Sequence, residues 1–293
     1  MDSKPLDILN NLGANIILNP YQRKLTASEI KNLLIKHDVI GLIAGVEPLT
    51  QDVLNTSTLK VISRCGTGLS NIDIQAAEEK SIQIFNTPDA PTQAVAELTI
   101  GALLSLLRMI PQMDNDLRND IWKKRFGSLL FDKTVGIIGF GKIGKRVSEL
   151  LRSFNVNILT YDYAELKTPN DILQVTMDEL LTKSDIITLH ASGNNCLLGT
   201  DEFRKIKKDC YILNAARGSL LDENCLIKAL QEEQIKGAWI DTFHQEPYNG
   251  PLKNFQQVIL TPHIGSYARE ARIQMEVEAS TNLVNFFKSN PVQ

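Results

Sequence analysis

Residues 134–144 read Thr-Val-Gly-Ile-Ile-Gly-Phe-Gly-Lys-Ile-Gly, and this stretch decides the fold. It begins with an apolar run that predicts a buried strand over 134–140. It continues with the spacing G-x-G-x-x-G, which opens a helix predicted over 143–154. In such a unit Gly139 makes the tight turn, Gly141 admits a pyrophosphate and Gly144 lets the helix pack closely on the strand. The stretch therefore predicts a Rossmann-type dinucleotide site at the N-terminus of that helix.

An acidic residue after the next predicted strand bears on which dinucleotide is bound. That strand covers residues 155–161, and Asp162 follows it directly. A carboxylate at this point accepts hydrogen bonds from ribose hydroxyls and repels a 2′-phosphate. The following residues, 163–165, add no arginine. An exposed Asp in an ordinary turn is the alternative, but the strand, glycines and helix in register argue against it. The sequence predicts NAD as the cofactor.

Strands and helices alternate on both sides of this unit, which is typical of a parallel α/β protein. A long apolar helix is predicted after Thr92, buried nearly all round. A last helix, over 267–288, is expected to return to the first half of the chain. The second half contains six predicted strands that fit one doubly wound sheet, at residues 134–140, 155–161, 185–190, 210–215, 237–242 and 258–261.

The first half predicts a second, smaller α/β domain. It contains a predicted helix over 26–36, for which Ser28 is the candidate capping residue. A turn-rich segment with two prolines, residues 86–91, is interpreted as a hinge. We expect one domain of residues 1–91 plus 265–293 and a Rossmann domain of residues 92–264 inserted in it. The strand candidates of the first half are residues 15–18, 39–44, 59–63 and 82–85.

Composition excludes several classes of function. The net charge is −3 in a chain of 293 residues, so there is no basic field for nucleic acid or for a membrane surface. No apolar run reaches the ~20 residues that span a bilayer. The cysteines lack C-x-x-C spacing, which argues against a metal site and predicts reduced thiols in a cytoplasmic protein. They are Cys65, Cys196, Cys210 and Cys225.

Three polar residues follow strands of the predicted sheet, at the edge where Rossmann folds bind ligands. They are Arg217, Glu246 and His263. Hydride transfer to a 2-oxo acid needs a proton donor, and histidine suits this role because its ordinary pKa lies near neutrality. An arginine fork can hold the substrate, and a carboxylate can keep the imidazolium protonated. Singly, each residue is more often structural; their convergence on one edge favours catalysis.

The chain resembles the D-isomer-specific 2-hydroxyacid dehydrogenase family along nearly its whole length. The matching stretches in the second half are Gly136–Gly144, Asn214–Asp222, Asp241-Thr-Phe-His-Gln-Glu246-Pro247 and Leu260-Thr-Pro-His263-Ile-Gly-Ser266. The first half adds Arg64-Cys-Gly-Thr67-Gly68-Leu-Ser-Asn-Ile-Asp73 and Ala94-Val-Ala-Glu97-Leu-Thr. The resemblance implies a Rossmann NAD domain inserted in a flavodoxin-like substrate domain, and a homodimer formed through the NAD domain.

The resemblance also implies roles for single residues. Arg217 would bind the substrate, and Glu246 with His263 would form the acid–base pair. Backbone N–H groups at Thr67 and Gly68 would hold the substrate carboxylate, with Arg64 as a further anion contact. Asp241 would contact the nicotinamide carboxamide. The implied cofactor residues are Gly139, Phe140, Gly141, Lys142, Ile143, Gly144, Asp162, His190, Ala215, Ala216, Asp241 and His263.

Three departures from the family pattern stand out. No strand precedes the helical residues that begin at Leu6, although the family normally has one there. Residues 191–194 lack the proline that commonly follows His190. Phosphoglycerate enzymes often carry an arginine where this chain has Gly45.

The function predicted from the sequence is NAD-dependent oxidation or reduction at C2 of a small 2-hydroxy or 2-oxo acid. Phosphoglycerate dehydrogenases belong to the family, so 3-phosphoglycerate or a related acid is the expected substrate. A formate or phosphite enzyme is a second possibility, although formate enzymes of this group usually place Gln where Glu246 stands. The alternative from another class is a catalytically weak protein that senses NAD(H) and binds partners.

Overall fold

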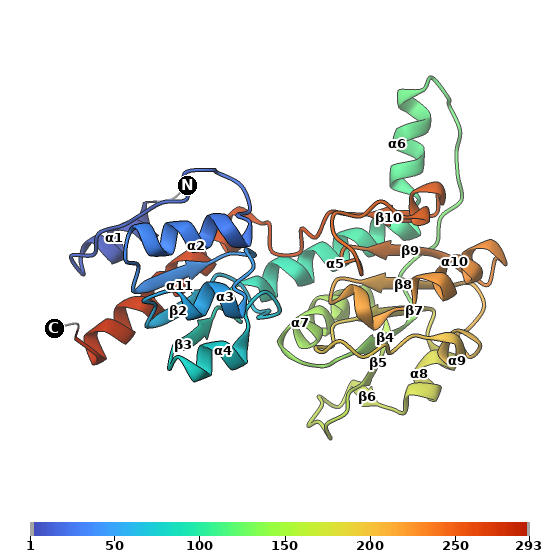
Figure 1. Ribbon diagram of the computed structural model, residues 1–293. Helices are drawn as coiled ribbons and strands as arrows, with labels where there is room; N and C mark the ends of the chain where they lie inside the picture. Colours follow the sequence, from blue (N-terminus) through green and yellow to red (C-terminus); the bar gives the residue numbers. More distant parts are fainter. Residues whose placement is uncertain (1–2, 292–293) are drawn as a thin grey trace. The chain divides into compact units, whose positions relative to one another are not determined.

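The computed structural model describes residues 3–291 and divides the chain into two compact units. One unit comprises Met1–Pro91 and Ser266–Gln293, and the other comprises Thr92–Gly265. Each unit contains one sheet of parallel strands with helices packed on it (Figure 1). The chain is therefore a two-domain α/β protein, in which the second unit is inserted in the first.

The sheet of the second unit has the Rossmann order. Its strands lie in the order β10-β9-β8-β7-β4-β5-β6. Numbered along the chain from β4, this is the doubly wound order 3-2-1-4-5-6 with one further strand at the edge. The strands are β4 (Thr134–Ile138), β5 (Asn157–Tyr161), β6 (Ile172–Gln174), β7 (Ile186–Leu189), β8 (Cys210–Asn214), β9 (Ile235–Ile240) and β10 (Val258–Leu260).

One strand, β6, was not predicted from the sequence. Only Ile172–Gln174 pair with β5, and this is too short a run for hydrophobic periodicity to reveal. The other six predicted strands are present. The helical segments of this unit are α5 (Pro91–Leu107), α6 (Ile110–Arg118), α7 (Lys142–Leu151), η1 (Arg152–Phe154), α8 (Met177–Lys183), α9 (Thr200–Phe203), η2 (Gly218–Leu220), α10 (Glu223–Gln231) and η3 (Pro251–Asn254).

Two hydrophobic clusters hold this sheet between its helices, one on each face. One contains Ile212 and Leu226; the other contains Ile137, Val147 and Trp239. Helix α5 contributes Leu103 and Leu106 to the second cluster, and only Gln93, Glu97 and Gly101 along it are exposed. The expectation of a helix buried nearly all round is therefore confirmed.

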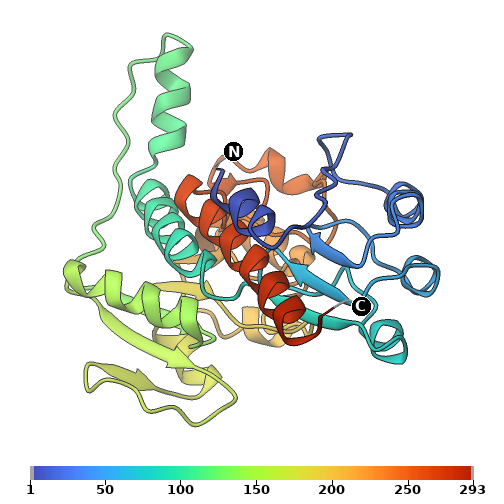
Figure 2. The same cartoon turned by 90° about the vertical axis from the view of Figure 1, so that its left-hand side faces the viewer.

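The first unit has a smaller sheet, with the order β1-β2-β3. Its last helix packs on all three strands and runs beside α1 (Figure 2). The final helix thus returns to the first half of the chain, as expected. The elements are α1 (Lys4–Asn10), α2 (Ala27–Lys36), β1 (Gly41–Ala44), α3 (Gln51–Asn55), β2 (Val61–Arg64), α4 (Ile74–Glu79), β3 (Gln83–Asn86) and α11 (Arg269–Ser289).

The prediction of a strand over residues 15–18 is wrong. These residues have no ladder partner, and Ile17 and Leu18 are 42% and 64% exposed. A strand needs a neighbour to receive its backbone hydrogen bonds, and the start of the described chain forms helix α1 instead. The expectation that residues 1–5 contain no strand agrees with Ser3, Lys4 and Pro5; residues 1 and 2 lie outside the described residues.

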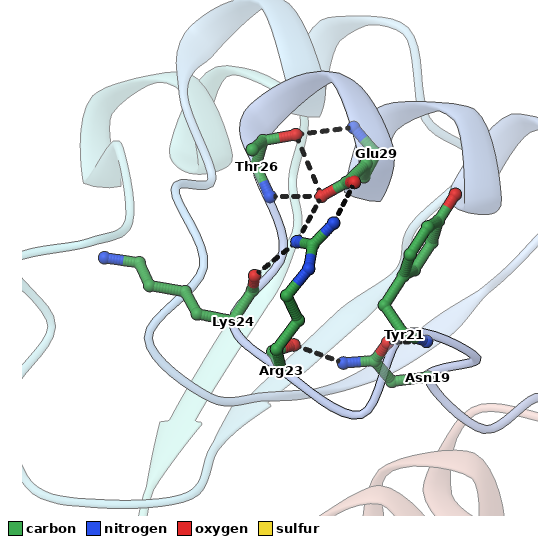
Figure 3. A network of polar contacts seen from close by, with 6 residues as sticks. All are labelled: Asn19, Tyr21, Arg23, Lys24, Thr26 and Glu29. Atoms are coloured by element: carbon green, nitrogen blue, oxygen red, sulfur yellow. Dashed lines mark hydrogen bonds and ion pairs between the residues drawn. The ribbon is translucent and has the colours of Figure 1, made fainter.

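The start of α2 also differs from the prediction, because the capping residue is Thr26 and not Ser28. The Thr26 hydroxyl accepts the Glu29 N–H at 3.3 Å, and the Glu29 carboxylate accepts the Thr26 N–H at 2.9 Å (Figure 3). This reciprocal pair is a capping box. Arg23 holds the same carboxylate in place, and its hydrogen bond is the main reason that the pKa of Glu29 falls to about 2.

Helix α6 and the chain that follows it stand away from the sheet of the second unit (Figures 1 and 2). No single helix within residues 3–291 is long and apolar enough to cross a membrane. Helices α5 and α6 meet such a criterion only when they are taken together, across a bend of 64°.

Candidate functional site

The glycine-rich turn between β4 and α7 has the geometry that its sequence predicts. Gly139 has a φ of +90°, and a Cβ there would overlap the backbone of His190 and Ala191. A Cβ on Gly144 would overlap the carbonyl oxygen of Gly139, so this glycine permits the close packing of α7. Around Gly141, by contrast, no protein atom lies within 4 Å of an added Cβ. The space beside Gly141 is therefore free of protein atoms, and this is where a pyrophosphate must approach the backbone.

The other residues of the turn support this cradle. Phe140 is buried in the hydrophobic core, and Ile143 is partly buried against the same core. Both side chains therefore anchor the turn to the core. Lys142 is the exposed first residue of α7. Asp162, at the end of β5, accepts the Phe140 N–H at 2.8 Å, which brings its carboxylate beside the turn. A helix N-terminus with an adjacent carboxylate fits the phosphates and ribose of NAD.

His190, at the end of β7, lies next to the same turn. Its backbone N–H donates to the carbonyl oxygen of Ile138, and its Nε2 lies 2.9 Å from the Thr188 hydroxyl. The residue is only partly buried, but Nδ1 is enclosed and has no hydrogen-bond partner among the described residues. Burial lowers the pKa of His190 to about 4, so the imidazole is neutral at pH 7.

His263 and Glu246 form a directly hydrogen-bonded pair. The imidazole Nδ1 lies 2.9 Å from Glu246 Oε2 and 3.2 Å from Oε1. The N–H of Phe243 donates to Oε1 at 3.0 Å and so fixes the carboxylate. The side chains of His263 and Glu246 are 51% and 38% exposed, so a ligand can reach them. Because Nδ1 is engaged with a carboxylate, Nε2 is the nitrogen left to act on a substrate.

The turn that carries His263 is held by a buried network. His263 itself has a φ of +53°, a strained conformation for a residue with a side chain. Asp241 is completely buried; its carboxylate accepts the N–H groups of Ile264 and Gly265, both at 2.9 Å. The Thr261 hydroxyl also donates to Asp241, at 2.6 Å, and accepts the indole N–H of Trp239 at 2.9 Å. Asp241 therefore positions the turn that carries His263. Its contact with the nicotinamide stays a prediction.

The loop that carries Arg217 follows β8. The Asn214 amide braces it by donating to the carbonyl oxygen of Arg217 and accepting the N–H of Ala216. A Cβ on Gly218 would overlap the backbone of Phe243 and His244, so this loop lies against the one that leads to Glu246. Ala216 is buried, whereas Ala215 and Arg217 are partly exposed. Within the second unit, the loop of Arg217 thus lies beside the loop that leads to Glu246.

The candidate anion-binding residues lie in the first unit, at the end of β2. Gly66 has a φ of +138°, and the Arg64 guanidinium folds over it and donates to the carbonyl oxygen of Cys65. Thr67 is exposed and Gly68 is partly exposed. Within the described part of the chain, the N–H groups of these two residues donate to no protein acceptor. Such free N–H groups in a glycine turn can bind an anion.

Sequence reasoning missed the supporting residues of this site. Trp239 was treated only as part of a strand, and the N–H of Phe243 gives no signal in a sequence. Thr261 and Asp241 lie in stretches that match the family, but their mutual hydrogen bond depends on the pairing of β9 with β10. Among the described residues, no group of three or more His, Cys, Asp or Glu side chains is placed to hold a metal ion.

Replacing Asp241 with alanine is expected to destabilise the fold by about 2–5 kcal/mol, because two backbone N–H groups lose their acceptor. Asp241→Asn retains one acceptor oxygen and should cost less. Urea unfolding of both variants beside the natural protein measures this. An unchanged free energy of unfolding in Asp241→Ala would contradict the positioning role.

Comparisons with known proteins agree with this geometry. Residues 100–265 match the D-isomer specific 2-hydroxyacid dehydrogenase, NAD binding domain. The chain is 39% identical over 259 residues to the D-3-phosphoglycerate dehydrogenase of Methanocaldococcus jannaschii, covering 85% of this chain and 49% of that protein. It is 37% identical to the glyoxylate reductase of Thermofilum pendens, covering 88% of this chain and 80% of that one.

A solved structure of an NAD-dependent enzyme is also similar to this chain. The NAD-dependent formate dehydrogenase from Staphylococcus aureus, in complex with NAD, superposes with a TM-score of 0.84 and 28% identity, covering 99% of this chain and 90% of that one. The chain spans about half the length of the phosphoglycerate dehydrogenases that it matches. The match over residues 100–265, the geometry of the glycine turn and the paired His263 and Glu246 lead to one conclusion: the chain belongs to the D-isomer-specific 2-hydroxyacid dehydrogenase family, and its cofactor is NAD.

Proposed function

We propose that this protein is an NAD-dependent oxidoreductase that interconverts a small D-2-hydroxy acid and the corresponding 2-oxo acid. The observation that carries the proposal is the hydrogen bond between His263 Nδ1 and Glu246 Oε2, at 2.9 Å, on a turn held by buried Asp241. An exposed imidazole backed by a fixed carboxylate is the arrangement that a general acid needs.

In the proposed reaction, each residue of the site has a separate role. NAD, when bound, supplies or accepts the hydride. His263 gives its Nε2 proton to the oxygen that becomes the hydroxyl, and takes it back in the reverse direction. Glu246 favours the protonated imidazole until the transfer occurs. Arg217 holds the carboxylate and carbonyl of the substrate through its planar fork. The free N–H groups of Thr67 and Gly68, with Arg64, bind the substrate carboxylate.

The acid itself is proposed only as a class. Relatives include proteins named D-3-phosphoglycerate dehydrogenase and glyoxylate reductase, which supports 3-phosphoglycerate or a related small acid. The test is NADH oxidation by the purified protein with 3-phosphohydroxypyruvate, hydroxypyruvate, glyoxylate, pyruvate and 2-oxoglutarate. Turnover of one acid supports the proposal. NADH binding without turnover of any acid, or turnover of formate, would contradict it.

A second candidate, a weakly catalytic protein that senses NAD(H), is favoured by one observation. Within residues 3–291, the sheet of the first unit has three strands, and the exposed residues 15–18 lie outside it. A flavodoxin-like sheet has five strands, so the candidate substrate unit has a reduced core. NADH binding with no turnover across the panel is the result expected for this candidate.

We further propose that the protein forms a homodimer through the arm of residues 110–131. This arm exposes large apolar side chains that a monomer leaves in water: Trp122 is 82% exposed, Phe126 102% and Leu129 68%. Several large apolar side chains exposed along one segment are typical of a surface that binds a protein partner. A cytoplasmic location stays a prediction.

The double variant Trp122→Ala/Phe126→Ser is expected to weaken the dimer, since buried aromatic side chains dominate interface energies. Sedimentation equilibrium should give twice the chain mass of 32.7 kDa for the natural protein and a smaller average mass for the variant. Leu173→Ser is a matched control, because Leu173 is 61% exposed on β6, away from the arm. A natural protein of single-chain mass at every concentration would contradict the proposal.

A further inference from the structure

One carboxylate of the first unit is buried beside the candidate anion site and is not used by the proposed reaction. Glu47 is only 9% exposed and lies in the loop that follows β1. Its two carboxylate oxygens accept the same donor, the N–H of Gly45, at 3.0 and 3.1 Å. No ion pair of Glu47 with a lysine, arginine or histidine occurs among the described residues. A buried carboxylate without a cation is costly, so Glu47 is a candidate for contact with a ligand that carries a hydrogen-bond donor.

The loop of Glu47 is fixed to the loop that contains Thr67 and Gly68. The Cys65 N–H donates to the carbonyl oxygen of Ala44 at 2.8 Å, which joins the ends of β1 and β2. The Asn71 amide donates to the carbonyl oxygen of Glu47, also at 2.8 Å. Since paired strands lie ~5 Å apart, the Glu47 carboxylate at the end of β1 lies within about two strand spacings of the turn after β2.

Gly45 allows the carboxylate to take this position. A Cβ at Gly45 would stand 3.0 Å from Glu47 Oε2, closer than an ordinary contact. A side chain at position 45 would press on this carboxylate, so glycine makes it easier for Glu47 to fold back onto the backbone of Gly45. Gly45 and Glu47 thus act together, and the end of β1 presents a negative group beside a turn suited to anions.

We propose that Glu47 selects the chemical class of the substrate. This inference rests on the proposed function, in which the turn at Thr67 and Gly68 binds the carboxylate of a 2-oxo acid. The far end of the same acid then lies near Glu47. A phosphate or second carboxylate at that end is repelled, because two like charges this close in a partly buried site oppose each other. A hydroxyl or ammonium group is accepted, since it can donate a hydrogen bond to the carboxylate. Within the class of acids given under the proposed function, this role of Glu47 favours an unphosphorylated 2-oxo acid with a hydrogen-bond donor at its far end over the phosphorylated acid.

The test compares hydroxypyruvate with 3-phosphohydroxypyruvate, which differ only by the phosphate. The natural protein should favour hydroxypyruvate in kcat/KM, and Glu47→Gln should reduce that preference by about tenfold or more, mainly through a lower KM for the phosphorylated acid. Glu78→Gln is the matched control, because Glu78 is an exposed carboxylate of α4 in the same unit. An unchanged ratio in Glu47→Gln, or a natural preference for the phosphorylated acid, overturns the proposal.

A binding measurement separates this proposal from the proposed function. Isothermal titration calorimetry of the NADH-loaded protein with D-glycerate and with 3-phospho-D-glycerate requires no turnover. Weaker binding of the phosphorylated acid by the natural protein, relieved in Glu47→Gln, supports the role of Glu47 even if no acid is reduced. Equal relative affinities in the natural protein and in Glu47→Gln, or binding of neither acid, overturn it.

Discussion

Replacing His263 with alanine is expected to lower kcat/KM for the best 2-oxo acid by about 10²–10⁴-fold, which is the usual contribution of a positioned general acid. The reason is geometric: His263 is exposed, its Nδ1 is held by Glu246, and its turn is fixed by Asp241. Without the imidazole, the developing alkoxide must take its proton from water. The variant should retain most of its NADH affinity, because the glycine turn that is proposed to hold the pyrophosphate is formed by other residues.

His244→Ala is the matched control for this variant. His244 is also an exposed histidine of the second unit, nineteen positions before His263, and no hydrogen bond to a carboxylate is found for its side chain among the described residues. Steady-state kinetics of both variants with NADH and the best acid give the comparison. Comparable activity in His263→Ala and His244→Ala would contradict the assignment of the general acid.

Alanine substitutions at two glycines of the G-x-G-x-x-G turn are expected to have different effects: one should mainly lower stability, and the other should mainly weaken NADH binding. Gly144→Ala drives a Cβ into the carbonyl oxygen of Gly139 and should destabilise the protein by about 1–3 kcal/mol or more. Gly141→Ala meets no protein atom within 4 Å and has an ordinary extended backbone. Its free energy of unfolding should change by no more than about 1 kcal/mol.

For NADH affinity the order is reversed, and Gly141→Ala should show the larger effect. In Gly141→Ala the new methyl group occupies the space through which the pyrophosphate approaches, so the dissociation constant for NADH should rise by about tenfold or more. Fluorescence titration with NADH and urea unfolding measure the two effects. Normal NADH affinity in a stable Gly141→Ala variant would show that the cradle does not bind the pyrophosphate.

The Rossmann unit was largely predictable because its signals are local. The glycine spacing, the apolar strand before it and Asp162 after the next strand lie within one short stretch, and each constrains the backbone directly. Arg217, Glu246 and His263 could be proposed as one site because the carboxyl ends of parallel strands meet at one edge of the sheet. Their catalytic roles stay predictions.

The failures of prediction arise where structure depends on distant partners. Residues 15–18 have the composition of a strand, but a strand forms only beside another, and none is available to them. The predicted capping residue of α2 is wrong because serine is intrinsically the better cap, whereas the capping box with Glu29, three residues after Thr26, selects Thr26. The burial of Asp241 and Glu47 could not be predicted either, since it results from loops that belong to neighbouring strands.

The central claim is that this chain transfers hydride between NAD and C2 of a 2-oxo acid. The most direct measurement follows deuterium into the product from NADH that carries deuterium at both hydrogen positions of nicotinamide C4, with the best acid of the panel. The product should be a 2-hydroxy acid of D configuration with one deuterium at C2, and His263→Ala should form at most about a hundredth as much in the same time. A product without deuterium at C2, or one of L configuration, would contradict it.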